Sequence, residues 1–204
     1  MAVIHCLGGG LVGSYVAKRL AESGHVVHAY DPSPQRVEGV SGIFIHYLEP
    51  DEDPIDAMAK VHTNDEGCPI DMVVNMLPGS IGHTSTTILA ESPWRTIDLS
   101  FSNLTPDRDS EKAKEFGASI LWDVGIAPGL SNMLLSEAHR KLGPLLIGEV
   151  RVGGNPTEHT SGWNYMAPFS PSDVIAEYTR PARVIRDSEE VTLPALSERH
   201  SISV

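Results

Sequence analysis

A glycine-rich turn near the start of the chain restricts the fold more than any other feature of the sequence. Residues 8–13, Gly-Gly-Gly-Leu-Val-Gly, fit the pattern G-x-G-x-x-G. The turn follows an apolar run, Ala2 to Leu7, that is typical of a β-strand, and it opens a segment, Leu11 to Ser23, with helical spacing of apolar residues. The pattern alone is common by chance, but this strand–turn–helix context is the one that dinucleotide binding requires. We therefore predict a βαβ unit that binds a dinucleotide.

Each part of the turn has its own predicted role. Gly8 permits the tight turn, Gly10 leaves room for a pyrophosphate close to the backbone, and Gly13 lets the helix pack near the sheet. The free N–H groups at the start of the helix, around Leu11 and Val12, are expected to face the phosphates.

An acidic residue, Asp31, follows the expected second strand, His25 to Tyr30. A carboxylate at this point accepts hydrogen bonds from the adenosine ribose hydroxyls and repels a 2′-phosphate. The sequence therefore predicts NAD as the cofactor in preference to NADP. Arg36, a little further on, is a feature that would weaken this preference.

The first half of the chain alternates apolar runs with helical patterns, which indicates a parallel sheet in an α/β fold. The remaining strands are expected at Ile43 to Tyr47, Asp71 to Leu77, Arg95 to Leu99 and Ser119 to Asp123, with a surface helix at Asp107 to Phe116. Six strands in this rhythm are typical of a doubly wound Rossmann sheet. Ligands of such sheets lie beyond the carboxyl ends of the strands, so the residues there are expected to border the ribose and nicotinamide, or to be structural: Leu77, Pro78, Leu99, Ser100 and Gly125.

The character of the chain changes after Asp123. A helix is expected at Pro128 to Leu142, another opens at Ser170, and two short strands follow at Ala182 to Ile185 and Glu190 to Leu193. We predict a Rossmann domain at residues 1–127 and an α+β mixed-sheet substrate domain at residues 128–204. The last residues, 200–204, alternate like a strand with nothing after it, so we expect this second domain to be incomplete.

Composition excludes several kinds of partner. The net charge of −12 argues against nucleic acid, whose phosphates require lysine and arginine. No apolar run approaches the length of a membrane span, and no leader peptide is recognisable, so we expect a cytoplasmic chain without a membrane partner. Cys6 and Cys68 form no metal-ligand pattern, and no metal is expected. The acidic cluster Glu49 to Asp53 is interpreted as a solvated loop.

Residues 122–132, Trp-Asp-Val-Gly-Ile-Ala-Pro-Gly-Leu-Ser-Asn, resemble the saccharopine dehydrogenase family. Residues 75–79 and 97–101 are similar to the ends of the family's fourth and fifth strands, and residues 152–154 and 163–165 to the start of its substrate domain. Residues 167–171 and 177–183 resemble the lysine 6-dehydrogenase branch in particular. The relatives are longer than this chain, and the saccharopine-forming branch has an acidic residue where this chain has Ala127.

The resemblance implies oxidoreduction at a C–N bond, with hydride passing between nicotinamide C4 and the carbon that bears an amine or imine. The amine nitrogen must be unprotonated, so a base is useful. Asp123 is the first candidate for this acid/base role and Asp98 the second, although each can equally be a carboxylate that holds loop backbone. His83 is interpreted as an exposed histidine near a helix start, in preference to a proton carrier.

Substrate-binding residues are expected in the second domain. Trp163 and Tyr165 are candidates for the wall of the pocket, with a role as core aromatics the alternative. Arg180 and Arg183 are candidates for binding a substrate carboxylate, with a surface or structural role the alternative.

Two functions remain open at this point. The first is an NAD-dependent dehydrogenase that acts on lysine or a related amino acid or amine, with a polyamine-forming relative as a variant. The second is a truncated or non-catalytic dinucleotide-binding paralogue or fragment. An uncovered edge in the second domain leads us to expect self-association into a homo-oligomer, with disorder of that domain the alternative.

Overall fold

The computed structural model describes residues 1–64, 67–100, 104–154, 156, 166, 169–198 and 201. The chain divides into two compact units, Met1–Gly153 and Gly154–Val204, which are described separately below. The predicted boundary between cofactor and substrate domains, after residue 127, concerns function and stays a prediction.

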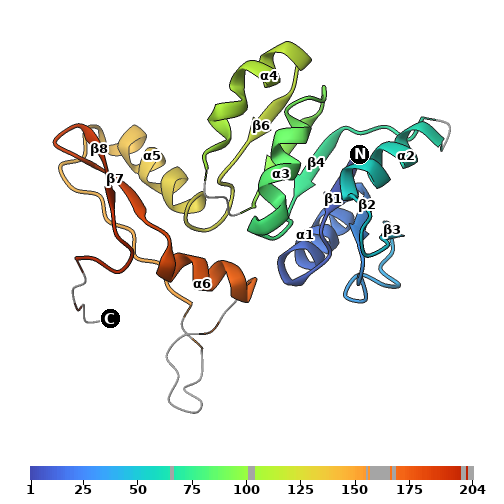
Figure 1. The fold of residues 1–204 in the computed structure, drawn as a ribbon, viewed down its shortest axis with the longest axis horizontal. Coiled ribbons are helices and arrows are strands. Elements are labelled where there is room, and N and C mark those ends of the chain that lie inside the picture. Colours follow the sequence, from blue (N-terminus) through green and yellow to red (C-terminus); the bar gives the residue numbers. More distant parts are fainter. Residues whose placement is uncertain are drawn as a thin grey trace. The chain divides into compact units, whose positions relative to one another are not determined.

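The first unit contains a six-stranded parallel sheet with the strand order β3-β2-β1-β4-β5-β6 (Figure 1). The strands are β1 (Val3–Leu7), β2 (Val26–Asp31), β3 (Ile43–Tyr47), β4 (Met72–Asn75), β5 (Arg95–Asp98) and β6 (Ser119–Leu121). This is the order of a doubly wound Rossmann sheet, in which the direction of winding reverses between β1 and β4. The predicted fold class is therefore confirmed.

Three expected strands, β4, β5 and β6, end earlier than predicted, and β5 is short by one residue, at Asp98. β4 stops at Asn75, because the Asn75 Oδ1 atom accepts the N–H of Leu77 at 3.3 Å and turns the chain. β6 stops at Leu121, and Asp123 beyond it adopts a positive φ of 56° that a strand does not allow.

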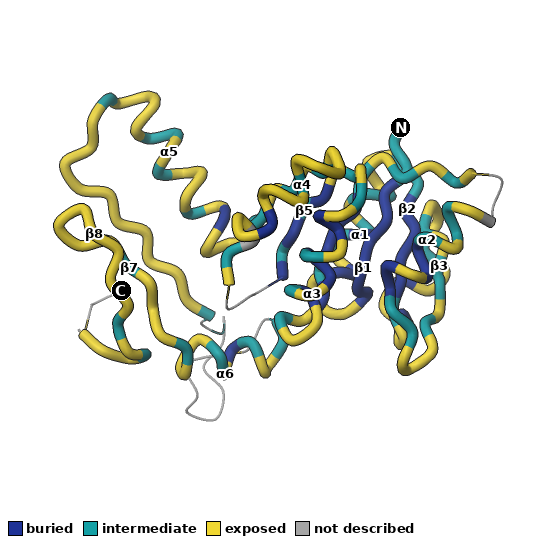
Figure 2. The backbone as a smooth tube through the Cα atoms, turned by 45° about the horizontal axis from the view of Figure 1, so that its top comes forward, coloured by how far each residue is buried: buried dark blue, intermediate teal, exposed yellow. Residues whose placement is uncertain are grey.

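Side chains of the central strands alternate between two apolar layers, as the pleat of a strand requires. The residues of one face that pack with α2 (Pro54–Asn64) and α3 (Gly79–Leu89) are Leu7, Tyr30, Val73 and Leu77, with Ile55, Met58 and Leu89 from the helices. The residues of the other face that pack with Ala17 of α1 (Leu11–Glu22) are Ile4, Cys6, Val27, Ala29 and Val74. Figure 2 shows β1 and β2 buried between these layers, whereas the edge strand β3 is only partly covered.

The helix α2 was not expected from the sequence. The acidic cluster before it is a loop, as interpreted, but its last residue also caps the helix. The Oδ1 atom of Asp53 accepts the N–H groups of Ile55 and Asp56 at 2.7 and 3.2 Å, and Pro54 occupies the first helical position. Both features are helix-start signals that stabilise the first turn.

The rest of the first unit contains η1 (Pro106–Asp109), α4 (Ser110–Phe116) and α5 (Leu130–Leu142). The second unit contains α6 (Pro171–Thr179) and an antiparallel hairpin of β7 (Ala182–Arg186) and β8 (Glu189–Leu193). Asp187 and Ser188 join the two strands with positive φ angles of 50° and 68°, which suits the twist of a tight hairpin.

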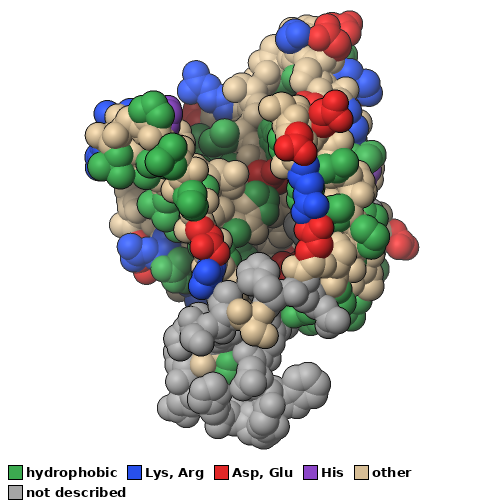
Figure 3. All heavy atoms as spheres, turned by 90° about the vertical axis from the view of Figure 1, so that its left-hand side faces the viewer, with side chains coloured by type: hydrophobic (Ala, Val, Ile, Leu, Met, Phe, Trp, Pro, Cys, Tyr) green, Lys and Arg blue, Asp and Glu red, His purple; other side chains and the backbone are tan. Residues whose placement is uncertain are grey.

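On the face drawn in Figure 3, acidic and basic side chains are interspersed among hydrophobic ones. None of the helices in the described ranges is long and apolar enough to cross a membrane. The strand-like pattern at residues 200–204 lies outside the described residues, apart from Ser201.

Candidate dinucleotide site

The glycine turn joins β1 to α1 with little steric freedom. Gly8 has a φ of 98°, which a residue with a side chain rarely adopts, and a Cβ atom there would lie 3.1 Å from the carbonyl oxygen of Met76. A Cβ atom on Gly13 would lie 2.0 Å from the carbonyl oxygen of Gly8. Both glycines are therefore needed for the turn and for the close packing of α1, as predicted from the sequence.

Gly10 differs from these two glycines because its Cβ position opens into empty space. No described atom lies within 4 Å of that position, and the backbone angles there, φ −67° and ψ −152°, are open to other residues. Gly10 is also the N-cap of α1 and has no side chain to cap the helix. The helix start, with Leu11 and Val12 both exposed, therefore presents backbone N–H groups to this opening.

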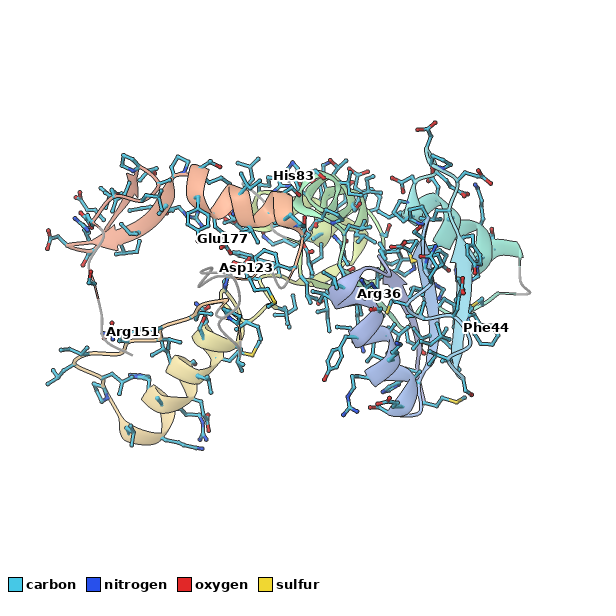
Figure 4. The ribbon with its side chains drawn as sticks, turned by 90° about the horizontal axis from the view of Figure 1, so that it is seen from below. Arg36, Phe44, His83, Asp123, Arg151 and Glu177 are labelled. Atoms are coloured by element: carbon cyan, nitrogen blue, oxygen red, sulfur yellow. The ribbon has the colours of Figure 1, made fainter. Side chains whose placement is uncertain are left out.

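The carboxylate of Asp31 lies against the glycine turn at the end of β2. Its Oδ2 atom accepts the N–H of Gly9 at 2.6 Å, and its Oδ1 atom accepts the N–H of Ser33 at 2.7 Å. These two hydrogen bonds fix the side chain, while each oxygen retains a lone pair for a further donor. Arg36 is exposed on the loop that follows (Figure 4).

A second helix starts at the same edge of the sheet. Leu77 is buried after β4, and Pro78 is the N-cap of α3. Asn75, a fully buried residue that was not among the predicted site residues, donates from Nδ2 to the carbonyl of Gly82 at 3.1 Å. Asn75 therefore stabilises the turn between β4 and α3. In the sequence, this residue was noted only as part of the motif at residues 75–79 that resembles the family.

Asp98 is buried at the end of β5, with both carboxylate oxygens in hydrogen bonds. Oδ2 accepts the hydroxyl of Thr86 in α3 at 2.7 Å, and Oδ1 accepts the N–H of Ser100 at 2.9 Å. These contacts fit the alternative in which Asp98 holds loop backbone. Its predicted acid/base role stays untested.

Ser100 lies where β5 ends, with Leu99 half-buried before it. The Oγ atom of Ser100 is buried and has no hydrogen-bond partner among the described residues. Buried hydroxyls nearly always have a partner, so this atom is available to a polar ligand at the sheet edge.

Asp123 is exposed in the loop after β6, and the N–H of its neighbour Val124 donates to the carbonyl of Asp98 at 3.3 Å. The ends of β5 and β6 are thereby joined, and both candidate acids lie on these adjoining segments. Beyond them, Gly125 accepts the N–H of Leu130 at 2.9 Å, and a Cβ atom on Gly129 would lie 2.2 Å from the oxygen of Gly125. Gly125 is therefore part of a tight crossing that starts α5.

His83 is more constrained than an exposed helix-start histidine. It is half-buried in α3, and its Nδ1 atom accepts a hydrogen bond from Arg108 Nη2 at 2.8 Å. The same Arg108 atom donates to Thr87 Oγ1 at 3.0 Å. An Nδ1 lone pair engaged by a guanidinium is not available as a base, which supports the interpretation of His83 as something other than a proton carrier.

The candidate substrate residues belong to the second unit. Trp163 and Tyr165 lie outside the described residues. Arg180 is at the end of α6, where burial lowers the pKa of its guanidinium and nearby Asp173 and Glu177 act in the opposite direction. The Nε atom of Arg183 lies 3.9 Å from a carboxylate oxygen of Glu190 on β8, in an exposed pair that fits a surface role.

Comparisons with known proteins point to the same family. Residues 125–203 match the family model described as the saccharopine dehydrogenase C-terminal domain. The chain is also similar to the structure of apo saccharopine dehydrogenase (L-Glu forming) from Saccharomyces cerevisiae, with a TM-score of 0.54 and 18% identity over 94% of this chain and 44% of that one. The match to the family model supports the resemblance to the family over residues 125–203, and the structural match supports the fold, whereas the lysine 6-dehydrogenase branch stays a prediction.

Another dehydrogenase structure matches with a lower TM-score. The 3-hydroxyisobutyrate dehydrogenase from Mycobacterium tuberculosis, determined with L-serine, matches with a TM-score of 0.41 and 24% identity over 60% of this chain and 40% of that one. The chain spans less than half the length of either solved structure.

Proposed function

We propose that this chain is the dinucleotide-binding part of an oxidoreductase of the saccharopine dehydrogenase family. The observation that carries the proposal is the contrast within the glycine turn. Gly8 and Gly13 are held tightly by backbone, while Gly10 opens into empty space in front of the first turn of α1. A fold that needed glycine only for its own geometry would have no reason to leave Gly10 open.

The residues around this opening suit a nicotinamide dinucleotide. The N–H groups at the start of α1 are donors for the pyrophosphate, and Asp31 lies beside them as an acceptor for the adenosine ribose hydroxyls. The winding of the sheet reverses between β1 and β4. On the β4 side of this point, beyond β5, the Ser100 hydroxyl has no partner among the described residues and supplies a polar group. When bound, the nicotinamide ring would supply or accept the hydride.

We propose NAD as the preferred dinucleotide. Asp31 is a fixed anion at the ribose position, and a 2′-phosphate there would face it directly. Arg36 is exposed on the next loop and has no ion pair with Asp31 among the contacts of the described residues, so it does not neutralise that carboxylate.

The proposed substrate is lysine or a related amino acid or amine, with hydride transfer at a C–N bond. This choice rests on the family match of residues 125–203 and on the resemblance of residues 167–171 and 177–183 to one branch. Asp123 is the better candidate for the acid/base residue. Asp98 is already bound through both oxygens, whereas Asp123 is exposed on an adjoining loop.

Cofactor titration tests the dinucleotide site. We expect saturable quenching of protein fluorescence by NADH in the wild-type chain, and its loss in Gly10→Val, whose side chain would occupy the opening. Tyr15→Val is the matched control, because it places valine at an exposed position further along α1. Equal affinity in a folded Gly10→Val chain would refute the site.

An assay of lysine-dependent NADH formation separates the two functions that the sequence leaves open. Turnover that is lost in Asp123→Asn would support the dehydrogenase. A chain that binds NADH but does not oxidise lysine or a panel of related amines would support the non-catalytic dinucleotide-binding alternative.

A further inference from the structure

Three histidines form a continuous stack across three neighbouring strands of the first unit. The ring centroids of His5 in β1 and His28 in β2 lie 4.8 Å apart, and those of His28 and His46 in β3 lie 5.2 Å apart, with 11° between the ring planes in both pairs. His5 is fully buried and His28 nearly so. His5 and His28 lie in the middle of their strands, away from the glycine turn, while His46 lies one residue before the end of β3.

A thiol lies at the edge of this stack. Cys68 precedes β4, and its Sγ atom lies 3.5 Å from His28 Nε2 and 4.0 Å from His5 Nε2. The residue is half-buried, whereas the other cysteine, Cys6, is fully buried in the opposite layer of the sheet. Cys68 is therefore the cysteine that a solute can reach, and it touches an imidazole.

The hydrogen bonds around the stack limit where its protons lie. The Nε2 atom of His5 is 3.0 Å from the carbonyl of Pro69, which can only accept, so this nitrogen carries the proton. The Nδ1 atom of His5 then accepts the hydroxyl of Tyr30 at 2.9 Å. His5 is thus fixed in one neutral form, and its N–H points to the side of the stack where Cys68 lies.

His28 is positioned between the thiol and a third ring. Its Nδ1 atom lies 2.9 Å from His46 Nε2, while its Nε2 atom faces Cys68. If Nδ1–H donates to His46, Nε2 carries the lone pair and faces the Cys68 thiol at 3.5 Å. An activated nucleophile generally has a base within hydrogen-bond reach and a third group that orients this base.

We propose that Cys68, His28 and His46 form a nucleophilic thiol site that small uncharged carbon electrophiles alkylate. The Cys68 proton moves to His28 Nε2, and the thiolate sulfur attacks the carbon of the electrophile. A C–S bond forms, the bond from carbon to its leaving group breaks, and the leaving group departs as an anion. The imidazolium of His28 then returns its proton to solvent.

The same residues are less suited to binding a metal ion. The described residues include no group of three or more His, Cys, Asp or Glu side chains placed to hold a metal ion. The proton on His5 Nε2 also blocks the nitrogen of that ring which lies nearer to Cys68. Proton transfer between one thiol and one imidazole needs only the Cys68–His28 contact.

Alkylation by iodoacetamide, followed by mass spectrometry of the Cys68 and Cys6 peptides, tests the proposal. At pH 7 an ordinary thiol is only a few per cent ionised, so we expect Cys68 in the folded chain to react about tenfold faster than Cys68 in the denatured chain. Burial raises the pKa of Cys6 to about 12, so Cys6 should stay unlabelled until the chain unfolds. Reaction of Cys68 no faster than in the denatured chain would overturn the proposal.

Two further measurements assign the effect to His28. His28→Gln should bring the rate back to that of the denatured chain, whereas His139→Gln, on the exposed surface of α5, should leave it unchanged. Because His28→Gln removes a buried ring, the wild-type pH profile provides a second test. Between pH 6.5 and 8 the rate should rise less steeply than that of the denatured reference.

The titratable groups that enter this profile are His5 and His46, which contact the pair, and Tyr30, His62 of α2 and Asp71 before β4, which act on His5. A rate that rises tenfold per pH unit in the folded chain, or one that His28→Gln leaves as high as in the wild type, would contradict the role of His28.

Discussion

Asp31 Oδ2 accepts the N–H of Gly9 at 2.6 Å, which ties the end of β2 to the glycine turn after β1. A Cβ atom on Gly9 would lie only 3.1 Å from Asp31 Cβ, so the two residues pack against each other as well. The carboxylate that is proposed to select the cofactor is therefore held by the same turn that is proposed to bind its pyrophosphate.

Asp31→Asn should reduce the preference for NAD over NADP. The change removes the negative charge that opposes a 2′-phosphate while keeping one acceptor oxygen. We expect the difference in binding free energy between the two cofactors to fall by about 1–3 kcal/mol. Fluorescence titration with NADH and NADPH measures it, with Asp51→Asn as a control that makes the same charge change on an exposed loop. An unchanged preference would remove Asp31 from the cofactor site.

Gly13→Ala should destabilise the fold, in contrast to Gly10→Ala. The new methyl group of Gly13→Ala would lie 2.0 Å from the carbonyl oxygen of Gly8, so α1 must move away from the sheet. Overpacking of this kind costs about 1–3 kcal/mol, whereas the methyl group at Gly10 meets open space. Urea unfolding of both variants tests the contrast, and equal midpoints would show that the turn is not packed as described.

Asp98→Asn should lower stability even without any substrate present. Its carboxylate accepts from both Thr86 and Ser100, and an amide would turn a donor towards one of these donors. A buried unsatisfied group of this kind costs about 1–3 kcal/mol. A double-mutant cycle of Asp98→Asn with Thr86→Val measures the coupling. Additive effects on the unfolding free energy would argue that the Thr86 contact contributes nothing.

Acid should destabilise the first unit through His5. Burial, the largest cause, lowers the pKa of His5 below its ordinary value of 6.5, and His46 and His62 act in the same direction. As the pH falls through about 6.5 the unfolded chain binds a proton that folded His5 does not, so stability is lost on that side and is present above it. His5→Gln should flatten the dependence of Tm on pH between 5 and 7.5. The exposed His139→Gln variant is the control, and identical slopes in wild type and His5→Gln would contradict this role.

The sheet could be predicted because its signals are local. The apolar runs and the glycine turn are continuous in sequence, and β3 was predicted with its observed bounds, Ile43–Tyr47. The helix α2 was missed although Asp53 and Pro54 form a cap and a first helical position, because the acidic residues before it were interpreted only as a loop. The helix α3 carries two glycines and several threonines, so packing on the sheet has to outweigh a weak helix propensity.

In the candidate site, too, some residues could be predicted from local sequence and others could not. The roles predicted for Gly8, Gly10 and Gly13 follow from a motif and its context. The contacts of Asp98 did not follow, because its partner Thr86 lies in α3, of which the sequence indicated only a start near His83. The stack of His5, His28 and His46 depends on strand register, which pairs His5 with His28 and Tyr30 with His46, and nothing in the spacing of these residues reveals it.

The position of β3 at the edge of the sheet has a consequence for handling the protein. Its sequence, Ile-Phe-Ile-His-Tyr, contains no lysine, proline or acidic residue, and Phe44 and Tyr47 are 56% and 61% exposed. Edge strands without such residues invite strands of other molecules. At low ionic strength the net charge of −12 keeps copies apart, but at about 0.1 M salt this repulsion reaches only about 10 Å. Concentrated samples should therefore stay clear in dilute buffer and turn cloudy as salt is added, the reverse of what a protein held together by charge would do.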